Sequence, residues 1–227
     1  MTVNNNDPRF ISASLGALEN APREYLFKRP IDICLSFLGL LLSSPLWVVI
    51  SIAILLEDGA PIFYRSSRVG KWGKPFEALK FRTMIRDSDS RFGPLQAGEN
   101  DKRITRVGKI IRPMALDELP QLWSIFTGDM SFVGPRALVP AEIEQRDESS
   151  EPVPIEEIPG YYERHSVRPG LTGLAQIYAA RDILRRRKFR YDLLYIRNIC
   201  FLLDLRLIAL SFWISFTGKW ECRWKKF

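Results

Sequence analysis

The sequence ICLSFLGLLLSSPLWVVISIAILL occupies residues 33–56 and contains no charged side chain. A run of roughly 18 apolar residues is long enough to form a membrane helix, and this run is longer. A polar stretch with asparagines at residues 4–6 precedes it, without a convincing small-residue cleavage site, which argues against a removable signal peptide. We therefore expect residues 23–60 to form a lasting membrane anchor and residues 1–22 to form a mobile tail.

The middle of this apolar run contains the triplet Ser-Ser-Pro at residues 43–45. Pro45 removes one backbone hydrogen bond of a helix, and a serine hydroxyl can satisfy the carbonyl group that is freed. A bend at Ser44 and Pro45 therefore costs little. Spanning helices also contain proline, so a kinked helix that crosses the bilayer is the alternative to a re-entrant helix, which enters and leaves on one face.

Charges at both ends of the run favour the re-entrant arrangement. The positive-inside rule places basic flanks in the cytoplasm, and both flanks are basic. The residues concerned are Arg23, Lys28 and Arg29 before the run, and Arg65, Arg68, Lys71 and Lys74 after it. Asp32 lies at the apolar boundary, where it would be costly without a partner, and we expect Arg29 on the same helical face to pair with it.

Length and composition set the outer limits of the fold and function. The 227 residues suffice for one domain plus an anchor, and the net charge of +7 suits an anionic partner such as nucleic acid, a phosphorylated substrate or a membrane face. Cys34, Cys200 and Cys222 are widely spaced and contain no CxxC pair, so the sequence encodes neither a zinc site nor a disulfide framework. A domain that faces the reducing cytosol fits these features.

The remaining segments predict an α+β fold. Residues 61–65 and 76–83 have the composition of two short strands in a hairpin, whereas the acidic, proline-containing residues 142–157 predict a mobile loop or frayed helix. Residues 185–216 begin with Arg-Arg-Arg-Lys and continue as an aromatic and aliphatic stretch, typical of an interfacial helix. Trp213, Trp220 and Trp224 have the character of headgroup-level anchors, although core packing is an equal alternative for them.

We therefore expect a mostly helical domain at residues 61–227 with a small β-hairpin, an N-terminal re-entrant membrane helix, interfacial amphipathic helices and a basic, aromatic C-terminal segment that associates with the membrane. No GxGxxG fingerprint follows a predicted strand, so a Rossmann nucleotide site is not expected.

The strongest signal for chemistry is RPMALDELPQLWSIFTGDMSFVGPR at residues 112–136, which places Asp117 and Glu118 between two arginines. Apolar residues at helical spacing predict a helix that begins near Asp117, with Pro120 in its first turn. The N-terminal end of a helix can receive a phosphate and keeps a carboxylate ionised and nucleophilic. The alternative is that Asp117 only caps the helix.

A series of spaced motifs resembles the monotopic phosphoglycosyl transferases of the bacterial sugar transferase family over about residues 23–216. The motifs are KRPID at 28–32, SSP at 43–45, KFRTM at 80–84, LDELPQL at 116–122, GDMSFVGPR at 128–136 and RPGLTGLAQI at 168–177. The resemblance implies transfer of a phosphosugar from a nucleoside diphosphate sugar, with uridine the expected base, to polyprenyl phosphate. This reaction would initiate glycan assembly on the cytoplasmic face of the bacterial inner membrane, with the anchor bent at Ser44 and Pro45.

The resemblance also implies roles for single residues. Asp117 would attack the β-phosphorus to give a covalent phosphosugar–aspartyl intermediate, and it would bind Mg²⁺, the expected cofactor. Glu118 is a candidate base or metal-positioning group. The candidate phosphate-binding residues are Arg112, Arg136 and Arg181, with Lys80 as a weaker candidate. Arg168 is a further candidate, for which a structural role before Pro169 and Gly170 is an equal alternative. Ala137 replaces the second proline that commonly follows the GPR motif, and the lone histidine, His165, is expected to be structural.

Two other functions remain open at this point. A catalytically inactive basic membrane adaptor that binds nucleic acid or an acidic protein would explain the charge and the anchor, but not the motifs. An enzyme that only hydrolyses diphosphates would explain the acids and arginines. For the transferase, the expected partners are a nucleoside diphosphate sugar, polyprenyl phosphate and membrane lipids, with no nucleic acid.

Overall fold

The computed structural model describes residues 24–86, 88, 101–140, 142–144, 152–180 and 183–220. The predicted tail at residues 1–22, the candidate Arg181 and the C-terminal residues that include Trp224 lie outside the described residues.

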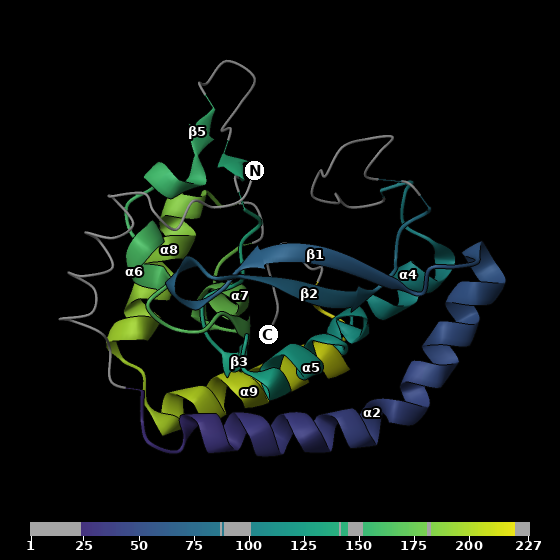
Figure 1. Cartoon of the computed structure of the whole chain (residues 1–227), viewed down its shortest axis with the longest axis horizontal. Helices are drawn as coiled ribbons and strands as arrows, with labels where there is room; N and C mark the ends of the chain where they lie inside the picture. The colour runs from purple at the N-terminus through teal and green to yellow at the C-terminus, as the bar shows by residue number, and fades with distance from the viewer. Residues whose placement is uncertain are drawn as a thin grey trace.

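The apolar run forms α2 (Lys28–Asp58), a helix of 31 residues with Pro45 inside it. Pro45 cannot donate to the carbonyl of Leu41, and the Ser44 hydroxyl donates to that carbonyl instead, at 2.8 Å. Figure 1 shows that α2 is bent, with its first part along the base of the molecule and its last part turned up towards α4 (Arg106–Ile111). The hydrogen bond that was expected to make a bend inexpensive is therefore present.

Both ends of α2 are bound to the same folded body. At its start, Lys28 Nζ lies 2.6 Å from Asp204 Oδ2 on α9 (Phe201–Phe216). At its end, the Glu57 carboxylate accepts hydrogen bonds from the first two backbone N–H groups of α4, at 2.6 and 2.8 Å. These contacts bind both ends of the helix to the domain.

The predicted pair between Arg29 and Asp32 is wrong. Asp32 Oδ1 accepts a hydrogen bond from the backbone N–H of Phe132 at 3.0 Å. The Arg29 guanidinium donates to the backbone carbonyls of Ile125 and Phe126, at 2.6 and 2.8 Å. Both side chains do share one helical face, but that face packs on the domain, where backbone groups are available as partners.

The predicted hairpin is confirmed, although its first strand extends to Val69 and its second ends at Phe81, before the predicted end at Thr83. β1 (Phe63–Val69) pairs antiparallel with β2 (Pro75–Phe81), and the 3₁₀ turn η1 (Lys71–Gly73) joins them. A short parallel pair, β3 (Ser131–Val133) with β6 (Gly170–Thr172), joins the two glycine-containing motifs and was not predicted.

The acidic segment at 142–157 is not simply a loop or frayed helix. β4 (Ile143–Glu144) pairs with β5 (Val153–Pro154), and η3 (Ile155–Glu157) follows. Residues 145–151, between the two strands, lie outside the described part of the chain.

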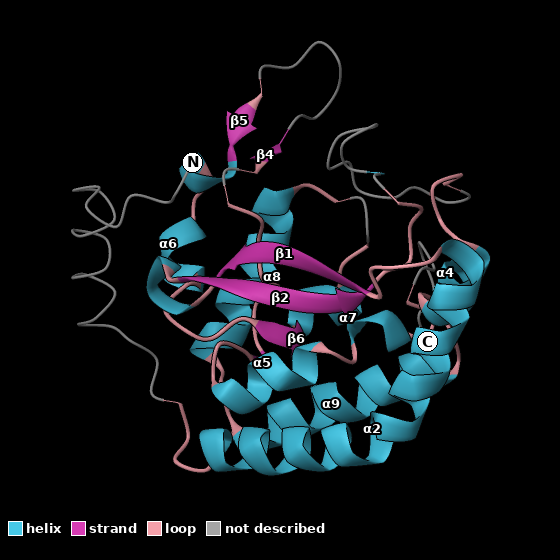
Figure 2. Cartoon of the chain, turned by 45° about the vertical axis from the view of Figure 1, so that its right-hand side comes forward, coloured by secondary structure: helices cyan, strands magenta, loops and turns pink. Residues whose placement is uncertain are grey.

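Helices form the rest of the fold, as expected for an α+β domain. They are η2 (Leu116–Glu118), α5 (Gln121–Thr127), α6 (Tyr161–Arg164), α7 (Leu174–Tyr178), α8 (Arg185–Arg197) and α9. The predicted interfacial helix at 185–216 is two helices, α8 and α9, separated at Asn198–Cys200. Figure 2 shows the ribbon of β1 and β2 above α5 and α9, with α2 at the base.

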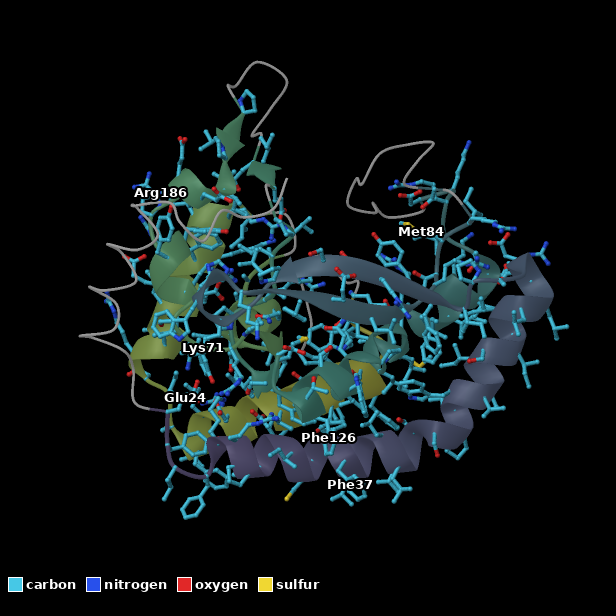
Figure 3. The ribbon with its side chains drawn as sticks, in the orientation of Figure 1. Glu24, Phe37, Lys71, Met84, Phe126 and Arg186 are labelled. Atoms are coloured by element: carbon cyan, nitrogen blue, oxygen red, sulfur yellow. The ribbon has the colours of Figure 1, made fainter. Side chains whose placement is uncertain are left out.

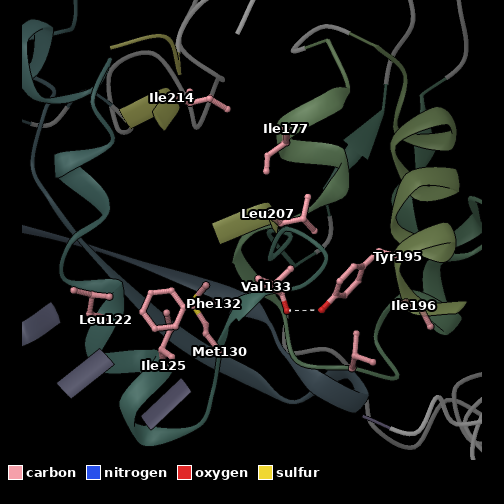
Figure 4. Close-up of a cluster of buried hydrophobic side chains, with 11 residues drawn as sticks. Leu122, Ile125, Met130, Phe132, Val133, Ile177, Tyr195, Ile196, Leu207 and Ile214 are labelled. Carbon is pink, nitrogen blue, oxygen red and sulfur yellow. Dashed lines mark hydrogen bonds between the residues drawn. The ribbon is translucent and has the colours of Figure 1, made fainter. Parts of the chain in front are cut away.

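The main core lies among α5, β3, α7, α8 and α9 (Figure 4). Its fully buried members include Ile125, Leu207 and Ile214. Tyr195 of α8 also donates a hydrogen bond to the carbonyl of Val133 at 3.1 Å, which fixes β3 against α8. The core therefore fixes the strand that leads into the GPR motif.

The outer faces of α2 and α9 carry large exposed apolar side chains. The two helices lie side by side at the base of the molecule in Figures 1 and 2. Only 11% of the most apolar window of α2 is buried, which distinguishes it from a core helix of a soluble protein. In Figure 3 Phe37 of α2 and Phe126 of α5 lie near each other at this base, with ring centroids 6.3 Å apart. The exposed residues of this apolar base include Leu41, Leu42, Val48, Val49, Leu56, Leu202, Phe212, Trp213 and Phe216.

Candidate active site

Asp117 and Glu118 lie in the short turn η2. Ala115 enters this turn in a left-handed conformation with φ 55°, so the chain reverses sharply just before the acids. α5 begins only at Gln121, and its N-cap position is Pro120. The predicted helix start near Asp117 is therefore too early, and Asp117 is not the cap of α5. A separate 3₁₀ turn before the helix presents the two carboxylates.

Glu118 is held by two cations. Lys80 Nζ on β2 lies 2.5 Å from Glu118 Oε1, and Arg136 Nη2 lies 3.3 Å from the same oxygen. Burial alone would raise the pKa of Glu118, but Lys80 and Arg136 outweigh it and lower that pKa to about 2. Glu118 is therefore an ionised and largely compensated carboxylate.

Asp117 has the opposite electrostatic balance. Its side chain is buried, and this burial raises the pKa of Asp117 to about 6, although Lys80 and Arg112 act against the shift. The neighbouring charge of Glu118 raises the pKa further. A carboxylate with a raised pKa is a stronger base and nucleophile once ionised.

The other predicted cations differ in whether they interact with the acids. Arg112 caps the end of α4, donates to the Thr83 hydroxyl at 3.2 Å, and acts on the charge of Asp117. Arg168 donates to the carbonyl of Gly128 at 2.9 Å and lies 3.5 Å from Glu24, without a hydrogen bond or ion pair to either acid in the described part of the chain. Its role in substrate binding, like that of Arg181, stays a prediction.

A pocket beside Glu118 brings in a residue that the motifs did not single out. It is lined by Arg68, Ala78, Lys80, Glu118, Gln121, Met130, Arg136, Ala137, Gly170 and Leu171. Arg68 comes from β1, and its Nη1 donates to the carbonyl of Ala137 at 3.5 Å. The predicted strand stopped at Arg65, so the alternation of side chains that places Arg68 over the site was not extended to it.

The turn after the GPR motif is fixed from both sides, although Ala137 replaces the second proline. The Arg164 guanidinium donates to the carbonyl of Arg136 at 2.6 Å, and the backbone N–H of Val69 donates to the carbonyl of Leu138 at 2.9 Å. His165 is buried next to Arg164, and both burial and that cation lower the pKa of His165 well below its ordinary value. His165 thus belongs to this support rather than to the acids.

The donor set suits Mg²⁺ in one specific way. Within the described residues no group of three or more His, Cys, Asp or Glu side chains forms a cation site. Mg²⁺ at a phosphate, however, often uses only one or two carboxylates together with phosphate oxygens and water. Burial raises the pKa of Asp117 although Lys80 and Arg112 act against the shift, and a bound cation would stabilise the ionised carboxylate further.

Comparison with known proteins places the chain in a family. A family model described as bacterial sugar transferase matches residues 23–218. The chain is 41% identical over 200 residues to a UDP-glucose:undecaprenyl-phosphate glucose-1-phosphate transferase of Klebsiella pneumoniae, covering 86% of this chain and 41% of that protein. It is 37% identical over 207 residues to a UDP-N-acetylgalactosamine-undecaprenyl-phosphate N-acetylgalactosaminephosphotransferase of Aeromonas hydrophila, covering 90% and 47% respectively.

The chain thus spans less than half the length of these two relatives. It covers 90% of a third, the exopolysaccharide production protein ExoY of Rhizobium meliloti, with 35% identity over 217 residues. On the family match and these similarities, the chain belongs to the bacterial sugar transferase family.

Proposed function

We propose that this protein is a phosphoglycosyl transferase that moves a phosphosugar from a UDP-sugar to polyprenyl phosphate through Asp117. The observation that carries this proposal is an acid pair, with Asp117 buried and Glu118 half-buried, that is surrounded by cations and adjacent to α2. Leu116 and Leu119, on either side of the acids, pack against a hydrophobic cluster that contains Ile50 and Ile54 of α2. An acceptor with a lipid tail and a phosphate head fits a charged site beside an apolar base.

In the proposed reaction, a carboxylate oxygen of Asp117 attacks the β-phosphorus of the donor. The bond from that phosphorus to the bridging oxygen breaks, and UMP leaves with the electron pair. A phosphate oxygen of the polyprenyl acceptor then attacks the same phosphorus, and the Asp117 carboxylate is released. The two negative partners repel each other in both steps, so positive charge must be in place beforehand.

The side chains around the acids supply that charge. The positive charge of Lys80 lowers the pKa of both carboxylates, so Lys80 stabilises the ionised form of each. Arg112 lowers the pKa of Asp117, and Arg136 forms an ion pair with Glu118. Bound Mg²⁺, held by Asp117, would neutralise carboxylate and phosphate oxygens together. Glu118 would then position the cations or the metal.

A re-entrant α2 on the cytoplasmic face of the inner membrane completes the proposal. Its support is that both ends of α2 contact the same domain and that Ser44 compensates the carbonyl freed by Pro45. The exposed apolar base of α2 and α9 would lie in the membrane, with the acids just above it. An inactive adaptor would need neither the acid pair nor the cations that hold it.

The test is turnover in lipid nanodiscs that contain undecaprenyl phosphate and Mg²⁺, with a panel of radiolabelled UDP-sugars. We expect UMP release and a lipid-linked product with at least one donor. Asp117→Asn is expected to lower turnover by about 10³-fold or more, because the nucleophile is lost. Asp129→Asn, at an exposed acid after α5, is the matched control. Without acceptor, mass spectrometry of the wild-type protein should detect a phosphosugar on Asp117.

Three outcomes would contradict the proposal. Full activity of Asp117→Asn would reject the nucleophile. Release of UMP without any lipid-linked product would favour the hydrolase. The absence of both products with every donor, together with nucleic-acid binding that falls steeply with salt, would favour the adaptor.

A further inference from the structure

Arg68 is a half-buried cation in the pocket beside Glu118, and no step above uses it. Within the described residues, its guanidinium makes one hydrogen bond, at 3.5 Å to the carbonyl of Ala137, and forms no ion pair with a carboxylate. Burial and the nearby like charge of Arg136 lower the pKa of Arg68. A guanidinium held near a second guanidinium, with most of its donors unused, is an arrangement that an anion would stabilise.

The hairpin register explains why Arg68 lies at this site. In β1 and β2, Arg68 pairs with Phe76, Ser66 with Ala78, and Tyr64 with Lys80. Residues that are opposite each other or two apart share one face of an antiparallel ribbon. Arg68 and Lys80 are therefore on the same face of the ribbon, and Ala78 between them lines the same pocket. Arg65 belongs to the opposite face and is exposed.

The charges that line the pocket do not balance. Arg68, Lys80 and Arg136 contribute three positive charges, and Glu118 is the one carboxylate in the lining. Asp117 and Arg112 interact with each other beside Glu118, and they contribute one negative and one positive charge. These six side chains have an excess of two positive charges, which Glu142 partly offsets at Arg68, and this excess suits phosphoryl groups rather than a neutral sugar.

We propose that Arg68 is a further substrate-binding residue that, together with Arg136, binds phosphoryl oxygens next to the acid pair. The proposal rests on the transferase function above. Phosphoryl oxygens come from two sources in that reaction, the diphosphate of the donor and the phosphate head of the lipid acceptor. A long hydrogen bond to the carbonyl of Ala137, at 3.5 Å, orients Arg68 towards the turn after the GPR motif and leaves it able to bind an anion.

The experiment uses the full chain in nanodiscs and separates the two half-reactions. UMP release is measured without acceptor, and resolution of the preloaded protein is measured after adding undecaprenyl phosphate. Arg68→Gln is expected to lower one of these steps by about 10- to 100-fold, the range for losing a hydrogen bond to a charged group. A slower first step with a raised KM for the donor assigns Arg68 to the diphosphate. A slower second step alone assigns it to the lipid phosphate.

Matched variants distinguish binding from folding. Arg65→Gln removes the same charge from the opposite face of β1 and should leave both steps unchanged. Arg68→Lys keeps the charge but not the planar fork, so it should recover part of the lost rate. Thermal unfolding of each variant reports whether the ribbon is intact. Direct binding of UMP, measured by calorimetry, provides a readout that does not depend on turnover.

If Arg68→Gln matches Arg65→Gln in both steps and in UMP binding, this inference is wrong while the transferase function stands. If the wild-type protein itself releases no UMP with any donor, the transferase function fails instead. A loss in Arg68→Gln that comes with an equal loss of folded protein, and disappears in the folded fraction, would also overturn the role in binding.

Discussion

Asp117 and Glu118 are neighbours in sequence and have opposite electrostatic environments. Glu118 shares one oxygen between Lys80 and Arg136, whereas Asp117 is buried without a direct ion pair in the described residues. The result is one carboxylate with a pKa of about 2 and one with a pKa of about 6. Paired acids whose environments separate their pKa values commonly divide the tasks of a site, and here the more basic acid is the proposed nucleophile.

This difference predicts a pH dependence of the first half-reaction. Asp117 must be ionised to attack, and its pKa is raised to about 6 by burial. As pH falls through about 6, the ionised fraction decreases, so UMP release should fall by nearly tenfold per pH unit below that value. The measurement is the rate of UMP release without acceptor between pH 5 and 8 at a fixed, subsaturating Mg²⁺ concentration, because Mg²⁺ bound to Asp117 would lower the pKa of this carboxyl group.

Lys80→Met provides a second arm of this test. Lys80 lowers the pKa of Asp117, so its removal should move the acid limb of the profile to higher pH. The exposed Lys74→Met on the same hairpin is the control and should not move it. An acid limb that stays in place in Lys80→Met would show that another group titrates.

The same pKa gives a signature in stability. The pKa of Asp117 is higher in the folded protein than the about 3.9 expected when unfolded, so its contribution favours folding at low pH and is lost as pH rises through about 6. Asp117→Asn should therefore stabilise the fold at pH 8 and not at pH 4, by thermal unfolding. An inactive variant that is more stable than the wild type is not inactive through misfolding.

The sequence could predict the acids but not all of their partners. Asp117 and Glu118 are adjacent, and Arg136 is in the next motif, so their spacing in the sequence was enough to identify them as candidate site residues. Arg68 is far from them in sequence and reaches the site only through the register of β1 on β2. Likewise, Arg29 donates to two backbone carbonyls of α5, and this tertiary contact replaces the local pair with Asp32 that the sequence predicted.

At the level of elements, predictability follows from the range of the contacts. The hairpin of β1 and β2 depends on a short turn, so local composition was sufficient. The pair of β3 and β6 joins residues 131 and 170, and each strand has only three residues, too few for an alternating pattern. It depends on close packing of two glycines, because a Cβ on Gly170 would lie 2.0 Å from the backbone nitrogen of Gly134.

A buried ion pair between α6 and α8 supports the turn after the GPR motif. Arg164 Nε lies 2.9 Å from Asp192 Oδ2, with side chains only 2% and 4% exposed. The guanidinium also stacks on Phe189 at 4.8 Å and donates to the carbonyl of Arg136. It therefore joins the core of α8 to the residue that holds Glu118.

Asp192→Ala should lower the free energy of unfolding by about 3–5 kcal/mol, because it leaves the Arg164 charge buried without a partner. The measurement is urea unfolding in detergent followed by tryptophan fluorescence. Glu163→Ala, at an exposed acid on α6, is the control and should change stability little. The double variant Arg164→Met with Asp192→Leu should be more stable than Asp192→Ala. Equal destabilisation of the double variant and the single variant would contradict this account of the pair.

For the whole molecule, the main question is how the apolar base meets the membrane. At about 1.5 Å per residue, a straight α2 would be about 46 Å long, more than the roughly 30 Å hydrocarbon layer. Length alone therefore permits a complete crossing. The contacts of Lys28 with α9 and of Glu57 with α4 oppose it, because a crossing would separate two ends that are bound to one body.

We predict that both ends of α2 face the cytoplasm, and single-cysteine labelling tests this directly. With Cys34, Cys200 and Cys222 replaced by serine, Leu26→Cys and Ala60→Cys each place one exposed thiol just outside either end of the helix. A maleimide that cannot cross membranes should label neither variant in intact cells and both after permeabilisation. Arg186→Cys, at an exposed position on α8, reports the side of the domain. Labelling of one end of α2 in intact cells would mean that the helix crosses the bilayer, and the acid pair would then need another route to its lipid acceptor.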